Sequence, residues 1–167
     1  MILNWRTRFA LLSLTTLVLV TTAMPQVSNP PQSAKDMSLA KPDGLKWVQI
    51  RPGNEMAIVY GNPEKEGELY AVRFRFADGF KVPAHWHPQD EHATVLQGTL
   101  LLGMGTTWDA AKLDTEMTQG TYIFLRKEMP HFALAKGETI LQAHGIGPFK
   151  IIYSNPADDP RNQKPKN

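Results

Sequence analysis

Three of the chain's five histidines lie in the segment GFKVPAHWHPQDEHATVLQG, residues 79–98, together with two acidic residues. Successive side chains of a strand point to opposite faces, so His85 and His87 share a face and can both reach one metal ion. Pro88 cannot donate to a strand ladder, so the chain turns there, and Glu91 returns on the next strand. Two imidazoles and a carboxylate predict one divalent transition metal ion: Fe, Mn, Ni, Cu or Zn.

A fourth ligand is predicted in the segment GTYIFLRKEMPHFALAKG, residues 120–137. His131 follows Pro130, which fixes a turn, and it begins a predicted strand. The alternative for all four side chains is a metal-free cluster whose polar groups hydrogen-bond one another. Such a cluster without an ion would be costly, because each buried polar group needs a partner.

The remaining two histidines are weaker candidates. His92 directly follows Glu91, so we expect it to face the opposite side of its strand. Gln142 and His144 are in phase with Ile140. If that phase faces the interior, Gln142 and His144 are candidate substrate contacts; if it faces outward, they are ordinary polar residues of a strand.

The elements that must position these side chains show a period of two. Tyr70, Val72, Phe74 and Phe76 alternate with more polar or smaller residues, as in a half-buried strand. Further strands are predicted over residues 47–50, 56–60, 81–87, 93–97, 99–104, 121–125, 131–135, 139–144 and 150–153. Glycine-containing turns at Gly98 and Lys136-Gly137 are expected to separate successive strands. The single helix candidate is about one turn over residues 109–113. The pattern predicts an all-β sandwich or barrel.

The ends of the chain differ from this core in composition. Residues 1–23 contain Arg6 and Arg8, an apolar run and no acidic residue, which predicts a cleavable secretory signal peptide. We therefore expect a secreted or periplasmic protein with no stable membrane insertion after cleavage; the alternative is an uncleaved membrane anchor. Residues 24–44 are predicted to be a flexible linker, 45–154 the folded domain, and 155–167 a C-terminal tail.

Charge and cysteine content narrow the partners. The net charge is +2, and loss of both signal arginines leaves a neutral chain. No basic stretch interleaved with aromatic residues is present, so nucleic-acid binding is not expected. The chain has no cysteine, which rules out disulfides and thiolate metal ligands.

The spacing Gly79-x5-His85-x-His87-x3-Glu91-x6-Gly98 resembles the first conserved motif of the cupin superfamily at every fixed position. The second cupin motif is matched in part. Gly120 and His131 are in register, whereas Arg126, Glu128 and Ala135 replace the family's Pro, Gly and Asn. More narrowly, the chain resembles small secreted single-domain cupins.

The resemblance implies a jelly-roll β-barrel over residues 45–154, flanked by a disordered linker and tail. It also implies a metal near one mouth of the barrel, held by His85, His87, Glu91 and His131, with open coordination positions for a small-molecule substrate. The expected activity is that of a dioxygenase- or oxidase-like oxidoreductase in which Glu91 acts as general base. The alternatives are a non-catalytic binding module for a small molecule or metal, and a Zn-type Lewis-acid isomerase or hydrolase. A homodimer is a further expectation from the resemblance.

Overall fold

A computed structural model describes residues 37–162 of the 167-residue chain. The predicted signal peptide, residues 24–36 of the predicted linker and the last five residues lie outside the described residues. Within 37–162, no helix has the length and apolar character needed to cross a membrane.

The described residues form nine β-strands and four short 3-10 helices, which confirms the predicted all-β class. The strands are β1 (Val48–Arg51), β2 (Asn54–Tyr60), β3 (Leu69–Phe76), β4 (Lys81–Trp86), β5 (Glu91–Met104), β6 (Thr115–Thr118), β7 (Tyr122–Leu125), β8 (His131–Ile146) and β9 (Ile152–Tyr153). The 3-10 helices are η2 (Pro42–Gly44), η3 (Ala110–Lys112), η4 (Pro156–Asp158) and η5 (Pro160–Asn162).

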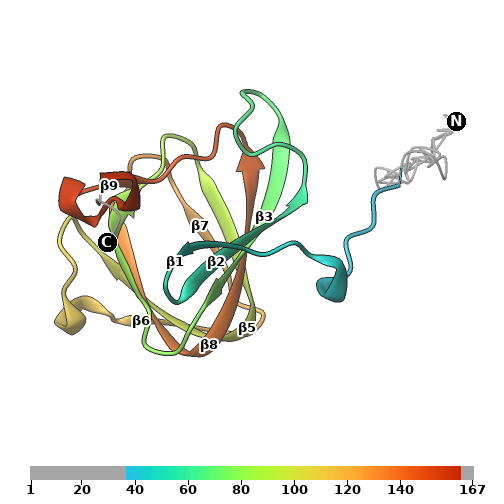
Figure 1. Ribbon diagram of the computed structural model, residues 1–167. Helices are drawn as coiled ribbons and strands as arrows, with labels where there is room; N and C mark the ends of the chain where they lie inside the picture. Colours follow the sequence, from blue (N-terminus) through green and yellow to red (C-terminus); the bar gives the residue numbers. More distant parts are fainter. Residues whose placement is uncertain (1–36, 163–167) are drawn as a thin grey trace, which may run out of the picture. The chain divides into compact units, whose positions relative to one another are not determined.

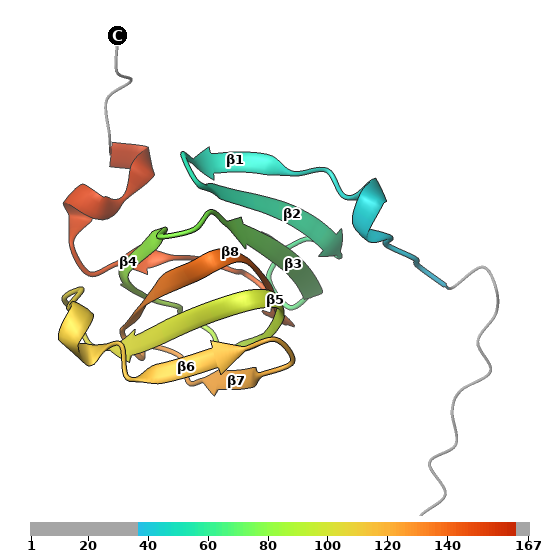
Figure 2. The same ribbon diagram turned by 90° about the horizontal axis from the view of Figure 1, so that it is seen from below.

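The strands form two layers that curl around a common interior (Figures 1 and 2). The first layer joins β1, β2, β3, the second half of β8, the first half of β5, and β7. The second layer joins β6, the second half of β5, the first half of β8, β4 and β9. Strands β5 and β8 therefore run through both layers, and all pairings are antiparallel.

The predicted breaks at Gly98 and Gly137 are wrong, because β5 and β8 each continue through their glycine. Both glycines adopt positive φ angles, 75° and 76°, which bend the strands without ending them. The pairing of β5 with β8 shifts register on either side of Gln97 and then resumes. Each pair of predicted short strands is thus one long, bent strand.

The core follows the alternation seen in the sequence. Tyr70, Val72, Phe74 and Phe76 of β3 are buried against inward-facing residues of β5 and β8. The predicted turn of helix is present as η3, capped by the Asp109 side chain, which accepts a hydrogen bond from the Ala111 N–H. Strand β6 was not predicted, because Thr115–Thr118 carries little hydrophobic alternation and is held by its pairing with β5.

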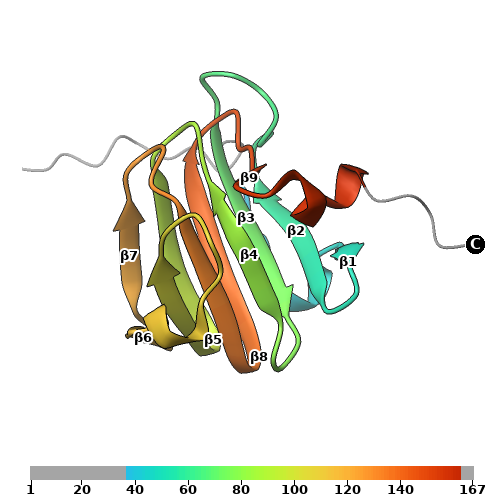
Figure 3. The same cartoon turned by 90° about the vertical axis from the view of Figure 1, so that its left-hand side faces the viewer.

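The C-terminal residues 155–162, expected as part of a tail, form η4 and η5 next to the barrel (Figure 3). Arg51 donates from Nη2 to the carbonyl of Asp158 at 3.0 Å and to the Tyr153 hydroxyl at 2.9 Å. This part of the chain therefore contacts the turn between β1 and β2.

Candidate metal centre

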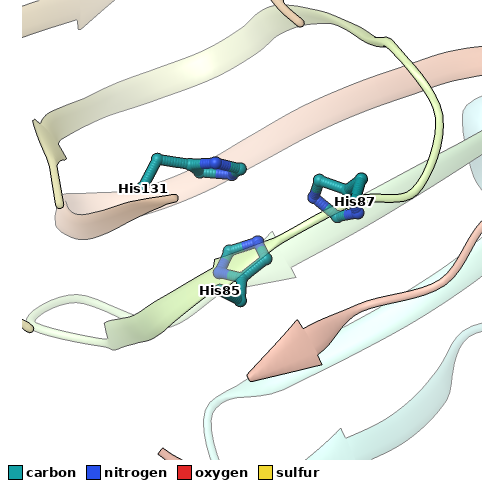
Figure 4. Close-up of side chains that lie close together, drawn as sticks. All are labelled: His85, His87 and His131. Atoms are coloured by element: carbon teal, nitrogen blue, oxygen red, sulfur yellow. The ribbon is translucent and has the colours of Figure 1, made fainter. Parts of the chain in front are cut away.

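Three histidine rings converge inside the barrel (Figure 4). His85 lies on β4, His87 follows directly after β4, and His131 begins β8, where it pairs across the ladder with His85. One nitrogen of each ring lies within 4.8 Å of the others, so the three side chains form a group that can bind a metal ion. The burial follows the predicted alternation, since Trp86 is only partly buried between the two buried histidines.

Glu91 joins the group from the opposite layer, at the start of β5. Its Oε2 lies 3.4 Å from His87 Nε2 and 3.5 Å from His131 Nε2. All four residues are buried, with only 5 to 7% of their surface exposed. The structure therefore brings together the four side chains that the sequence predicted as ligands.

The tautomers of the three histidines are fixed by the backbone. Nδ1 of His85 lies 2.7 Å from the Pro83 carbonyl, Nδ1 of His87 lies 2.8 Å from the Lys150 carbonyl, and Nδ1 of His131 lies 2.9 Å from the Met129 carbonyl. A carbonyl can only accept, so each Nδ1 carries the proton and, in a neutral ring, each Nε2 presents a lone pair.

Burial favours that neutral form in all three rings. It lowers the pKa of His87 to about 4, and it lowers the pKa of His131. Burial and the neighbouring rings hold the pKa of His85 well below its ordinary value. The pKa of Glu91 is raised, again chiefly by burial. The centre thus consists of hydrogen-bond acceptors in a buried environment, which disfavours protonation of the imidazoles.

These observations fit a bound metal ion. His87 Nε2 is buried and has no hydrogen-bond partner among the described residues. Three imidazole lone pairs and one carboxylate also face one another without a donor between them, an arrangement that a cation satisfies. Three nitrogens and one oxygen are borderline to hard ligands, which suit Fe, Mn, Ni, Cu or Zn.

The loop before His131 keeps its position despite the residues that depart from the second motif. Glu128 stands where the motif has glycine and takes a positive φ of 63°, a conformation that glycine adopts without strain. Its N–H donates to the His87 carbonyl at 2.8 Å. The Lys127 N–H donates to Asp90 Oδ1 at 2.8 Å. The two ligand-bearing segments are therefore tied together directly.

A cavity of about 70 Å³ adjoins the four converging side chains. Its wall is mostly apolar and includes Phe74, Leu102 and Phe149. One water molecule needs roughly 10–15 Å³, so the space admits a small ligand beside the metal position. Three polar residues that sequence analysis missed also line it: Arg51, Asn54 and Tyr153.

These three residues differ in how far the sequence could have predicted their place beside the cavity. Arg51 and Asn54 flank Pro52-Gly53, and a two-residue hairpin turn places the flanking residues opposite each other on one face. The sequence Arg-Pro-Gly-Asn therefore held usable information. Tyr153 had no such signal, because its pairing with His85 depends on the tertiary fold.

The other polar residues considered lie on the outside of the same sheet. Gln142 and His144 alternate with the buried Leu141 and Ala143 and do not line the cavity, so the outward-facing alternative holds for them. Gln142 accepts a hydrogen bond from Arg73, and the His144 ring stacks on His92 with 5.4 Å between centroids. His92 faces away from Glu91, as expected, with Nδ1 2.6 Å from the Tyr122 hydroxyl.

Comparison with solved structures gives several cupin-like neighbours. The polyketide cyclase RemF of Streptomyces resistomycificus is 16% identical, with a TM-score of 0.59 over 74% of this chain and 89% of that one. An oxalate oxidase is 20% identical, with a TM-score of 0.53 over 75% and 68%. Salicylate 1,2-dioxygenase of Pseudoaminobacter salicylatoxidans is 16% identical, with a TM-score of 0.50 over 62% and 30%. At these identities the likeness shows the fold alone.

A comparison with curated proteins finds no significant match. The family model described as Cupin matches residues 55–146, which include β2 to β8 and all four converging side chains. With the two-layered barrel, the first motif and the histidine of the second in place, this chain belongs to the cupin family.

Proposed function

We propose that this chain is a metal-dependent oxidoreductase of the dioxygenase or oxidase type, acting on a small organic molecule. The observation that carries the proposal is the convergence of three neutral imidazoles and one carboxylate beside a cavity. Four protein ligands leave coordination positions open to a substrate, as a catalytic centre requires. Bound Fe, Mn, Ni or Cu would supply redox chemistry with O2 at that position.

The chain's own residues supply orientation and proton transfer. The Pro83, Lys150 and Met129 carbonyls hold the three rings in one tautomer, so their Nε2 atoms stay aimed at one point. Phe74, Leu102 and Phe149 keep water from the substrate position. Burial raises the pKa of Glu91 above its ordinary value, which makes its carboxylate a stronger proton acceptor than an exposed one.

The fold leaves room for other chemistry, because one fold hosts many functions. Oxidoreductases and a cyclase both occur among the structural neighbours. Zn-type Lewis-acid chemistry and a non-catalytic binding module are therefore the outcomes against which the proposal is tested.

The deciding experiment is metal analysis of the purified protein, followed by O2 uptake with a panel of small organic substrates. We expect one redox-active metal ion per chain and substrate-dependent O2 consumption. Replacing Glu91 by Gln should lower turnover by roughly 100-fold or more, as loss of a general base does. Glu138→Gln, at an exposed position of β8, is the matched control. Bound Zn with O2-independent turnover would support Lewis-acid chemistry, and tight binding without turnover would support the module.

We also propose that the protein is secreted or periplasmic, on the strength of the signal-like residues 1–23. Mass spectrometry of the protein from its native compartment should find an N-terminus near residue 24. An intact N-terminus in the membrane fraction would favour the uncleaved anchor. A homodimer stays a prediction, to be checked by light scattering.

A further inference from the structure

The turn between β1 and β2 carries two polar side chains to the cavity. Arg51 and Asn54 pair across the ladder on either side of Pro52-Gly53, and Gly53 takes a φ of 81°. Both residues line the same cavity as the histidines and Glu91, although neither belongs to the converging ligand set. The hairpin therefore presents a second polar region to whatever occupies the cavity.

Arg51 is held in place without an ionic partner. Its Nη2 donates to the Tyr153 hydroxyl at 2.9 Å and to the Asp158 carbonyl at 3.0 Å, and its guanidinium carbon lies 5.3 Å from the centroid of the Tyr153 ring. It forms no ion pair with any residue of the part of the chain that the structure describes. The nearby Asp159 carboxylate is paired with Arg161. The Asp159 carboxylate also interacts electrostatically with Arg51, although no direct ion pair forms between them. Arg51 is thus an oriented cation whose Nη2 hydrogen bonds go to neutral oxygen atoms, and its other N–H groups can donate to an anion.

Asn54 adds a group that lacks a partner. Its Oδ1 is buried and accepts no hydrogen bond from the described residues. Buried polar atoms are satisfied in the great majority of cases, and an exception needs an explanation. A donor on a bound molecule, such as a hydroxyl group, provides one.

Tyr153 links this region to the metal centre. It pairs directly with His85 across the ladder of β4 and β9, and their ring centroids lie 6.2 Å apart. The hydroxyl that accepts from Arg51 therefore belongs to a residue that packs beside a metal ligand. Arg51 and the three histidines also line one cavity, so a molecule in that cavity is exposed to both groups.

We propose that Arg51, Asn54 and Tyr153 form a carboxylate-binding subsite, and that the substrate is a small hydroxylated organic acid. This inference rests on the metal centre of the proposed function. In it, the guanidinium of Arg51 binds the substrate carboxylate, Tyr153 holds the guanidinium in place, and Asn54 Oδ1 accepts from a substrate hydroxyl. Charge agrees with the assignment: a divalent ion beside one Glu91 carboxylate keeps a positive charge, Arg51 adds another, and a substrate carboxylate neutralises one of the two.

The test measures binding of glycolate and of its neutral counterpart glycolamide to the metal-loaded full-length protein by calorimetry. Glycolate is chosen because the cavity is smaller than the ~150 Å³ that accommodates benzene. We expect the wild type to prefer glycolate, and Arg51→Gln to reduce that preference at least tenfold with unchanged metal content. Arg73→Gln, on the outer face of β3, is the matched control and should keep the preference. A preference that survives Arg51→Gln overturns the proposal.

Two further variants test the subsite even if the Arg51→Gln variant does not fold. Tyr153→Phe should weaken glycolate binding two- to fivefold, and Asn54→Ala should reduce the preference for glycolate over acetate, which lacks the hydroxyl. Wild-type affinities in both variants would also overturn the subsite. Metal content and O2 uptake distinguish failure of the subsite from failure of the proposed function. If the protein binds metal and consumes O2 but its glycolate preference does not depend on Arg51, the proposed function stands and the subsite is overturned. If the protein binds no metal but its glycolate preference depends on Arg51, the subsite stands and the proposed function is overturned.

Discussion

Two groups of histidines lie on opposite faces of the barrel wall, and they differ in what holds them. In the inner group, His85, His87 and His131 each give Nδ1 to a backbone carbonyl and turn Nε2 toward a common point. In the outer group, the rings of His92 and His144 stack on each other, and His92 Nδ1 forms a hydrogen bond with the Tyr122 hydroxyl. The inner rings are positioned for a ligand, whereas the outer rings are positioned by each other.

The comparison shows that residue type alone does not make a metal site. Strand β8 supplies a histidine to each group, His131 facing inward and His144 facing outward. What distinguishes them is the face of the strand, the burial, and a carbonyl placed to take the Nδ1 proton.

The largest expected effect comes from breaking the inner group. His87→Ala should leave the protein with little bound metal and lower its unfolding temperature by several degrees, because metal binding stabilises the folded state. Metal analysis and calorimetry are the measurements. His92→Ala, on the outer face, should change neither quantity. Equal metal content in the two variants would contradict the assignment of the inner group.

A second effect, of intermediate size, concerns pH in the metal-free protein. Burial lowers the pKa of His87 from its ordinary 6.5 to about 4, so between these values the unfolded chain binds more protons than the folded one. Stability is therefore fully present above pH 6.5 and falls as the pH drops toward 4. The shifted pKa of His87 alone should lower the free energy of unfolding by about 2 kcal/mol between pH 7 and pH 5.

His85 and His131 act in the same direction, whereas the raised pKa of Glu91 opposes them. Chemical denaturation after metal removal measures the slope. His87→Gln should flatten it, and the outer variant His144→Gln should leave it in place. A slope that His87→Gln leaves unchanged would show that this ring is not held neutral.

The smallest effect tests the loop that ties the inner group together. Glu128 sits at a positive φ, where a side chain costs roughly 1 kcal/mol and glycine costs nothing. Glycine also gains freedom in the unfolded chain, which offsets part of that difference. Glu128→Gly should therefore stabilise the protein by less than about 1 kcal/mol. Lys127→Gly, next to it, should destabilise the protein by a similar amount; the same sign for both would refute the explanation.

Much of this arrangement could be predicted because it depends on local periodicity. The alternation of His85, Trp86 and His87 defined their faces, and Pro88 and Pro130 marked the turns beside the ligand segments. The alternation in β3 indicated its buried face before any partner strand was known. These inferences need only the period of two and the chemistry of proline.

The rest depended on contacts between distant parts of the chain. Gly137 resembles a turn in sequence, yet β8 continues through it, so the inward phase of His131 extends to Leu141 and places Gln142 and His144 outside. In β5 the buried phase changes at the register shift after Val95, which no local pattern reveals. Arg51 reaches its partners 102 and 107 residues along the chain, a relation that only the folded barrel creates.

The continuity of β5 and β8 through both layers limits how the interior can be reached. Separating the two layers would break the hydrogen-bond ladders of both β5 and β8. Substrates must therefore enter through an end of the barrel. Arg51 lies at the end of the barrel formed by the β1–β2 turn, β9 and the C-terminal helices, so a molecule that entered there would pass its positive charge.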